Sequence, residues 1–238
     1  MNAVARFWDS TIGKKVVMAV TGIVGILFTL GHMAGNLTMF KGQQAMHDYA
    51  MLLRISPPLL WAIRLGLLAA VVLHVVAAAQ LTMRSRAARG SRYAKHEPQV
   101  STLSSRTIRV GGVVLLAFIV YHLLDLTLGY LNPGFVHLDP YRNLVASLSN
   151  PLVAAFYIVA VGFLMMHLHH GVWSMVRTLG LARPTPRPLH RRLSIAVSVL
   201  VAGGFMLVPF GVLFGIFKPV APLPLEERTD VPAAVSTR

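Results

Sequence analysis

The chain has 238 residues, of which 55% are hydrophobic and only 13% are charged, and its mean hydropathy is +0.64. These values exclude an ordinary soluble domain, in which about 25% of residues are charged, and indicate an integral membrane protein. The formal net charge is +14, but the basic residues are spread over separate connections, so we expect no nucleic-acid partner. The absence of cysteine excludes disulfides, thiolate haem ligands and iron–sulfur clusters held by this chain.

Five apolar runs, taken in chain order, are long enough to cross a membrane. The roughly 30 Å hydrocarbon core requires about 20 helical residues, and the runs cover about 16–40, 58–83, 110–131, 151–176 and 193–217. Because the connections are short, neighbouring helices should be antiparallel. The sequence therefore predicts an all-α integral membrane fold, a five-transmembrane-helix bundle. We expect one membrane domain over 1–218 and a flexible, proline-rich tail over 219–238.

The ends of these runs predict topology and location. The first run is too long for a signal peptide and lacks a small-residue cleavage site, so it should stay in the mature chain. Basic residues are frequent before it and in the second and fourth connections, whereas the other two hold only Lys41, Arg54 and Arg142. The positive-inside rule then places the N-terminus in the cytoplasm and the C-terminus outside a bacterial cytoplasmic membrane. The same charges suit contact with anionic lipid or a soluble partner.

One histidine lies inside each of the first four runs: His32, His74, His122 and His167. An imidazole surrounded by hydrocarbon is costly and needs a partner. Counted at 1.5 Å per residue from the less basic end of each run, His32 and His122 lie at depths of about 14 and 15 Å, and His74 and His167 at about 24 Å. We therefore expect His32 to pair with His122, and His74 with His167.

Two histidine pairs at two depths predict two b-type haems enclosed by the bundle, each with an imidazole on both axial positions of the iron. Such an iron suits one-electron conduction better than oxygen chemistry. Zinc is the rival metal, but a tetrahedral site would gather its ligands at one level. A single membrane histidine serves as often in hydrogen bonding or proton relay. Small residues beside the histidines leave room for a flat macrocycle, and suit close helix packing equally: Ala70, Ala77, Ala78, Gly35 and Gly171.

The fourth run holds two additional histidines. His170 shares a helical face with His167, whereas His169 points about 160° away. Depth does not distinguish these three as axial ligands. The remaining histidines are placed in connections and, except for His47, which is considered below, have no predicted role: His47, His96, His137 and His190.

Four motifs in order carry a family resemblance: GHMAGNL at 31–37, the LH pair of the second run, YHLLD at 121–125 and HLHHGVW at 167–173. Over nearly its whole length the chain resembles the dihaem cytochrome b membrane-anchor subunit of succinate:quinone oxidoreductases, which are the succinate dehydrogenases and fumarate reductases. In that family the fourth-helix ligand opens an HxxxG motif followed by an apolar and an aromatic residue. This motif maps onto His167, Gly171, Val172 and Trp173, so the resemblance implies that His169 and His170 are extra.

The resemblance also implies partners and a division of labour. A flavoprotein subunit with FAD would interconvert succinate and fumarate, and an iron–sulfur subunit would relay electrons. This chain would anchor both, exchange electrons with membrane quinone, expected to be menaquinone, and perform no succinate chemistry itself. The haem between His74 and His167 would face the iron–sulfur subunit, and the whole complex could form a higher oligomer.

Few residues are candidates for quinone or haem-propionate binding. Asp125 lies one turn beyond His122, where it would serve quinone chemistry or support an imidazole or a propionate. His47 and Asp48 are further quinone candidates in the first outer connection. Family members that use menaquinone often carry a glutamate in the spans, and no predicted span here contains one. The candidate propionate partners, which solvated helix ends explain equally well, are Arg106, Arg109 and Arg177.

Two other functions fit the same sequence features. The cytochrome b subunit of a hydrogenase or formate dehydrogenase also has several spans and bis-histidine haems. A transporter without redox chemistry could use membrane histidines as a proton relay.

Overall fold

The computed structural model describes residues 2–88, 103–182 and 189–228. Within these ranges every regular element is helical, and five helices are long and apolar enough to cross a membrane. They are α2 (Thr11–Leu37), α4 (Pro57–Ala87), α5 (Leu103–His122), α7 (Pro151–Thr178) and α8 (Leu189–Leu213). Short turns extend two of them, η1 (Thr38–Lys41) after α2 and the π-helical η2 (Leu123–Thr127) after α5. The predicted all-α fold with five candidate spans is confirmed.

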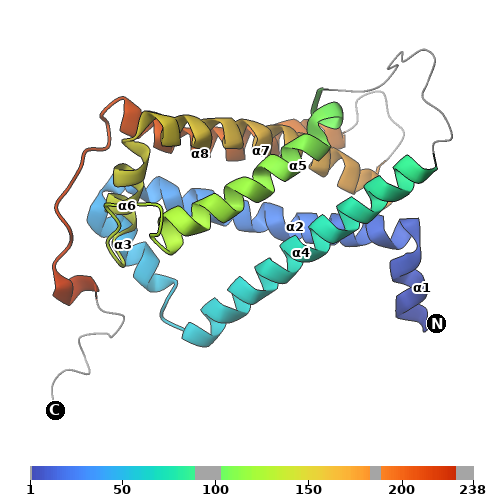
Figure 1. The fold of residues 1–238 in the computed structure, drawn as a ribbon, viewed down its shortest axis with the longest axis horizontal. Helices are drawn as coiled ribbons and strands as arrows, with labels where there is room; N and C mark the ends of the chain where they lie inside the picture. The colour runs from blue at the N-terminus through green and yellow to red at the C-terminus, as the bar shows by residue number, and fades with distance from the viewer. Residues whose placement is uncertain (1, 89–102, 183–188, 229–238) are drawn as a thin grey trace.

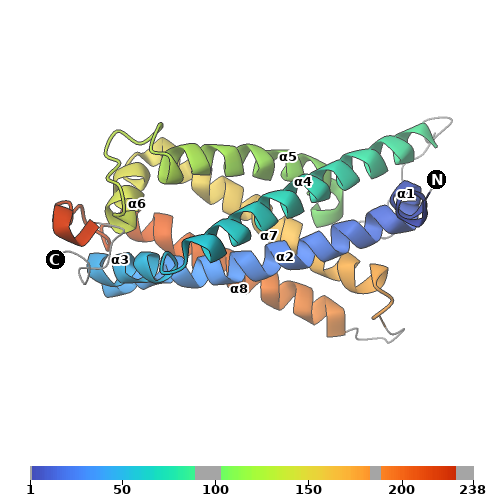
Figure 2. The ribbon, with the colours of Figure 1, turned by 90° about the horizontal axis from the view of Figure 1, so that it is seen from below.

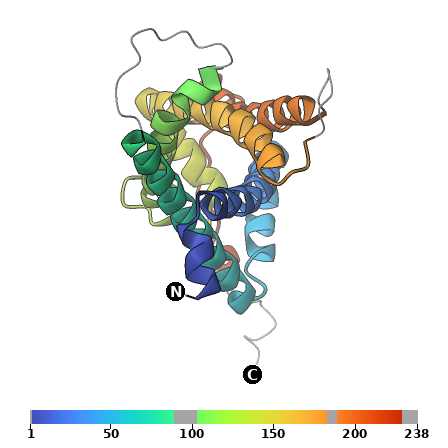
Figure 3. The ribbon, with the colours of Figure 1, turned by 90° about the vertical axis from the view of Figure 1, so that its right-hand side faces the viewer.

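The five long helices run lengthwise through the molecule (Figure 1). The helix α7 packs against α8 and α5, and α2 packs against α4, α7 and α8. Seen from one end, these helices surround a common axis (Figure 3). The helices bury only part of their apolar side chains against one another. Many apolar side chains therefore face outward, as expected for helices surrounded by lipid.

Local sequence sets several helix ends, and these differ from the predicted ends. The helix α2 begins at Thr11 because Ser10 Oγ accepts a hydrogen bond from Gly13 N (2.8 Å). The helix α8 ends at Leu213, four residues early, because Gly215 takes φ +71° and Ile216 N bonds back to Gly211 O (2.8 Å). The third run is helical from Leu103, the first described residue of its range, and its helix continues through η2 to Thr127.

Three short helices occupy segments that the sequence analysis treated as connections: α1 (Ala3–Asp9), α3 (Gln43–Leu52) and α6 (Pro140–Leu148). The helices α3 and α6 lie together at one end of the bundle, which we call the capped end (Figures 1 and 2). The helix α1 lies at the opposite end, which we call the basic end because it carries Lys15, Arg84, Arg109 and Arg177. The capped end holds the apolar core of the protein, which includes Met39, Met46, Tyr141, Leu144, Val145, Leu148, Val208, Val212 and Phe217.

The capped end corrects the expectation for His47. It was placed in a connection, but it lies on α3 and is only 4% exposed. Its Nδ1 lies 2.8 Å from Leu138 O, which fastens α3 to the segment before α6. This buried contact gives His47 a structural role.

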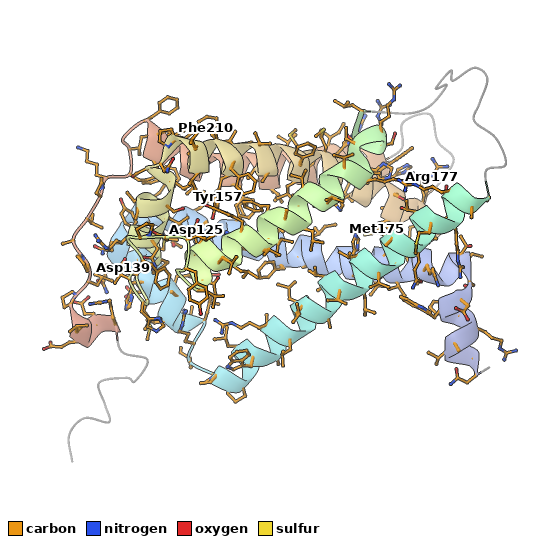
Figure 4. The ribbon with its side chains drawn as sticks, in the orientation of Figure 1. Asp125, Asp139, Tyr157, Met175, Arg177 and Phe210 are labelled. Atoms are coloured by element: carbon orange, nitrogen blue, oxygen red, sulfur yellow. The ribbon has the colours of Figure 1, made fainter. Side chains whose placement is uncertain are left out.

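Asp139 ties three segments together at the capped end (Figure 4). Its side chain is fully buried and caps α6 by accepting a hydrogen bond from Arg142 N (3.2 Å). Its Oδ2 accepts from Gln43 Nε2 (2.8 Å) and from Leu223 N (3.1 Å). The residues just after 219, predicted as part of a flexible tail, are therefore packed against the bundle through Leu223. Residues 229–238 lie outside the described ranges, and the division at 218 stays a prediction.

Gly35 allows α3 to approach α2. A Cβ at Gly35 would lie 2.5 Å from Tyr49 Cε1, well inside van der Waals contact. The residue was predicted to leave room beside His32 for a macrocycle or to permit close packing. The structure has the close packing, and Tyr49 of α3 fills the space.

We expect Asp139→Ala to lower the free energy of unfolding and to expose the segment around Leu223 to proteolysis. The substitution leaves the buried Leu223 N–H without its acceptor, at a cost of about 1–3 kcal/mol, and it leaves the Gln43 amide nitrogen with Ala221 O as its remaining acceptor. Thermal unfolding and limited proteolysis of the purified protein measure both effects. The control is Asp48→Ala, because Asp48 is exposed on α3. Equal cleavage rates in the two variants would contradict the role of Asp139.

We expect Gly35→Ala to destabilise the capped end by about 1–3 kcal/mol, the usual cost of overpacking. The new methyl group must displace the Tyr49 ring. Gly25→Ala on the same helix is the control, since a Cβ there meets nothing within 4 Å. Thermal unfolding of both variants tests the difference, and a Gly35→Ala protein as stable as Gly25→Ala would refute the packing argument.

Candidate functional site

The rings of His32 and His122 lie next to each other near the capped end. His32 projects from α2 and His122 is the last residue of α5. The ring centroids are 5.9 Å apart, and the ring planes are 87° from parallel. Phe28 stacks on His32 at 5.3 Å, and Phe118 lies 5.7 Å from His122. The first predicted pair is therefore brought together among aromatic rings.

The rings of His74 and His167 form a second pair, from α4 and α7. Their centroids are 6.1 Å apart and their planes differ by 52°. Ala70 and Ala77, on the His74 face of α4, are buried at 7% and 0% exposure. The structure therefore brings His74 and His167 together, as the predicted depths indicated.

The two pairs lie at different levels along the bundle. Eleven residues separate Thr21, which contacts His74, from His32 on α2, a rise of about 16 Å. Ten residues separate Tyr157, which contacts His122, from His167 on α7, a rise of about 15 Å. This separation exceeds the roughly 10 Å difference between the predicted depths. The helix α2 and the turn η2 end at Leu37 and Thr127, before the predicted ends of these runs, so His32 and His122 lie closer to the ends of their helices than predicted.

Each pair has the spacing of two imidazoles on opposite sides of one metal ion. Metal–imidazole bonds are about 2 Å long, as at zinc, and with the half-width of each ring added the centroids lie about 6 Å apart. No group of three or more histidine, cysteine, aspartate or glutamate side chains gathers as a metal site in the described ranges. Two nitrogens per site suit an ion whose other positions are filled by a macrocycle, so the residues fit haem.

The Nδ1 atom of His122 meets a buried hydroxyl. Tyr157 Oη lies 3.3 Å from His122 Nδ1 and donates its own proton to Asp125 Oδ2 (2.8 Å). A hydroxyl has one proton, so towards His122 it acts as acceptor and the imidazole carries its proton on Nδ1. This tautomer leaves Nε2 with a lone pair, which is the form that ligates a metal.

Asp125 owes its position to the π-helical turn η2. This turn follows His122 directly, and Asp125 within it is completely buried. Its Oδ2 accepts hydrogen bonds from Ser147 Oγ on α6 (2.6 Å) and from Tyr157 on α7. Single π-helical turns within α-helices occur frequently at functional sites. Figure 4 shows Asp125 and Tyr157 near the capped end and Arg177 at the opposite end.

His74 has an equivalent hydroxyl partner. Thr21 Oγ1 lies 3.0 Å from His74 Nδ1 and donates its proton to Val17 O (2.7 Å). Thr21 is therefore an acceptor towards His74, and Nε2 of that ring is also left with a lone pair. The Nδ1 atom of His167 is buried and has no hydrogen-bond partner among the described residues.

Open space adjoins several glycines of the bundle. A Cβ at Gly171, one turn beyond His167, would meet no atom within 4 Å, and neither would one at Gly31 or Gly162. A Cβ at Gly22 would meet only His74 Cε1, at 3.9 Å. Gly171 therefore keeps the role of a small neighbour that the sequence predicted, whereas Gly35 does not.

A cavity of about 460 Å³ opens at the basic end. It is lined by residues of α2 and α7: Ile12, Lys15, His170, Trp173, Ser174, Arg177 and Thr178. The Arg177 guanidinium lies 5.0 Å from the centre of the Trp173 ring. His169 lies apart from the cavity, with its Nδ1 3.2 Å from Ser104 Oγ of α5. Among the arginines predicted to bind propionates, only Arg177 lines this cavity, since Arg106 and Arg109 are on the first turns of α5.

The other candidate residues lie away from the two pairs. Asp48 is exposed on α3 and accepts a hydrogen bond from Gln44. His190 was placed in a connection, but it lies on α8 and stacks on Trp173 at 6.4 Å. His137 is exposed, and His96 lies outside the described residues.

Sequence reasoning did not find Thr21, Tyr157, Ser147 or Lys15. A polar residue within an apolar run was the available signal for Thr21 and Tyr157. Knowing which histidine each would meet requires the rotation of two helices about their axes, and the sequence pattern does not supply that rotation.

Comparison with known proteins finds a partial similarity. No family model and no solved structure matches the chain. The chain is similar to the succinate dehydrogenase cytochrome b558 subunit of Bacillus subtilis (strain 168), with 30% identity over 93 residues. The aligned segment covers 39% of this chain and 43% of that protein, so it spans less than half of either chain.

Proposed function

We propose that this protein is the membrane-anchor and electron-transfer subunit of a succinate dehydrogenase or fumarate reductase. It would pass electrons between an iron–sulfur subunit and membrane quinone. The observation that carries the proposal is the double pairing of His32 with His122 and of His74 with His167. The partial similarity to a succinate dehydrogenase cytochrome b558 subunit supports the same choice.

The four histidines would hold two b-type haems, one at each pair. When bound, such haems supply one-electron couples, and two of them stacked along the bundle supply a path for electrons across part of the membrane. Thr21 and Tyr157 hold His74 and His122 in the ligating tautomer. Phe28 and Phe118 exclude water from the pair near the capped end.

The cavity at the basic end would bind the propionates of the haem held by His74 and His167. Lys15 and Arg177 offer two cations, and His170 and Ser174 offer further polar atoms. The Nδ1 atom of His170 is buried without a hydrogen-bond partner among the described residues, and a carboxylate would satisfy it. Arg106 and Arg109 stay candidates for the same role.

The basic end would face the cytoplasm and bind the iron–sulfur and flavoprotein subunits. Its positive charge follows the positive-inside rule and attracts acidic surfaces. Quinone, expected to be menaquinone, would exchange electrons with the chain within the membrane. Asp125 has no exposed surface, which favours its alternative role in supporting an imidazole over direct contact with quinone.

The first test is isolation of the assembled complex in detergent, with identification of its co-eluting chains and pigment. We expect a flavoprotein, an iron–sulfur protein and a reduced-minus-oxidised absorption signal of two b haems per copy of this chain. A preparation without b haem contradicts the conduction model. Haem without succinate-to-quinone activity would favour the cytochrome of a different oxidoreductase.

We expect His167→Ala to remove one haem from the complex and His169→Ala to remove none. The ring of His167 faces His74, whereas that of His169 contacts Ser104 of α5. Both variants lose the same side chain from neighbouring positions of one helix, so the comparison controls for general damage to α7. Haem content is measured by quantitative absorption in the purified complex, and the reverse result would overturn the ligand assignment.

We expect Gly171→Leu to lower haem content to about half without unfolding the chain. A Cβ at Gly171 would meet no protein atom within 4 Å, and a leucine there would occupy space that the macrocycle beside His167 needs. Gly66→Leu on α4 is the control, because that position is also open and is exposed on the surface of the helix. Full haem content in Gly171→Leu would show that the macrocycle lies elsewhere.

A further inference from the structure

Tyr157 has contacts that exceed what packing requires. Its ring lies in an aromatic group with Phe118 (5.0 Å) and Tyr121 (6.2 Å). Its hydroxyl, in addition, joins a buried carboxylate to a predicted haem ligand, through 2.8 Å to Asp125 Oδ2 and 3.3 Å to His122 Nδ1. Because the single hydroxyl proton of Tyr157 is donated to Asp125, Tyr157 can only accept a hydrogen bond from His122.

We propose that Tyr157 is a positioning residue that sets the reduction potential of the haem held by His32 and His122. It does so by accepting a hydrogen bond from His122 while donating its own to Asp125. The inference rests on the proposed haem ligation, and it assigns a function to residues that the ligation alone does not require.

The carboxylate strengthens Tyr157 as an acceptor. Asp125 is completely buried, and both Ser147 and Tyr157 donate to the same oxygen of it. Hydrogen bonds to a carboxylate in a low-dielectric interior are short and strong, and each bond in a chain polarises the next. The oxygen of Tyr157 is therefore more electron-rich than that of an isolated phenol.

A stronger acceptor at Nδ1 makes His122 a more basic ligand through Nε2. A more basic ligand stabilises the ferric ion more than the ferrous ion, so the reduction potential of that haem is lowered. The buried negative charge of Asp125 acts in the same direction, because the ferric centre carries one more positive charge.

The second pair allows an internal comparison. At His74 the acceptor is Thr21, whose proton goes to the neutral carbonyl of Val17 rather than to a carboxylate. The two hydroxyls lie on different helices and at different levels, so each can be removed without touching the other. A residue that acts on one haem should leave the other unchanged.

The experiment is a redox titration of haem absorption in the assembled complex, with haem content measured in each variant. We expect Tyr157→Phe to raise the midpoint potential of one haem, so that its ferrous-to-ferric ratio at a fixed potential rises several-fold. A tenfold rise corresponds to about 59 mV for a one-electron couple. Thr21→Val should raise the midpoint of the other haem. Tyr121→Phe, the same chemical change within the same aromatic group, should move neither.

The outcomes separate this inference from the proposed function. A complex without b haem contradicts the proposed function itself. Two haems whose midpoints are unchanged by Tyr157→Phe, or shifted equally, overturn the role of Tyr157 and leave the ligation intact. If Tyr157→Phe prevents assembly, Asp125→Asn decides: an upward shift confined to one haem supports the proposal, and no shift overturns it.

Discussion

The structure depends on the cost of placing imidazole rings inside an apolar bundle. A polar group in hydrocarbon must find a hydrogen-bond or metal partner within the protein, because no water is available there. His32, His74, His122 and His167 face one another in pairs, and in the proposed function a metal ion between the two rings of each pair would be that partner. Since each ring is fixed to its own helix, the pairing sets the rotation of four helices about their axes.

Two helices serve both levels, with exchanged roles. At the level of His122, α2 provides the facing imidazole and α7 provides the hydroxyl of Tyr157. At the level of His74, α7 provides the facing imidazole and α2 provides the hydroxyl of Thr21. The helices α5 and α4 each contribute one histidine to one level. A change in the rotation or height of α2 or α7 would therefore disturb both pairs, which links the two sites mechanically.

Sequence reasoning succeeded where the position of a residue along its helix was sufficient. Hydropathy located the five spans, and a constant rise per residue sorted four histidines into two levels. It failed where position depends on tertiary contacts. The helices α3 and α6 carry too few apolar residues to register as spans, yet their buried faces hold Met46, Leu144 and Leu148. His47 was left in a connection for the same reason, and the hydroxyls of Thr21 and Tyr157 required helix rotations.

The two buried carboxylates of the capped end differ in a way that distinguishes structural from functional roles. Asp139 uses both oxygens, and its three donors come from a helix start, a neighbouring helix and the segment after α8. Asp125 concentrates two hydroxyl donors on Oδ2, while Oδ1 has no partner among the described residues. A carboxylate that only joined segments would gain from sharing its donors between both oxygens. In the proposed role of Asp125, the charge on Oδ2 polarises the Tyr157 hydroxyl, whose oxygen faces His122 Nδ1, as a residue that tunes a metal ligand would require.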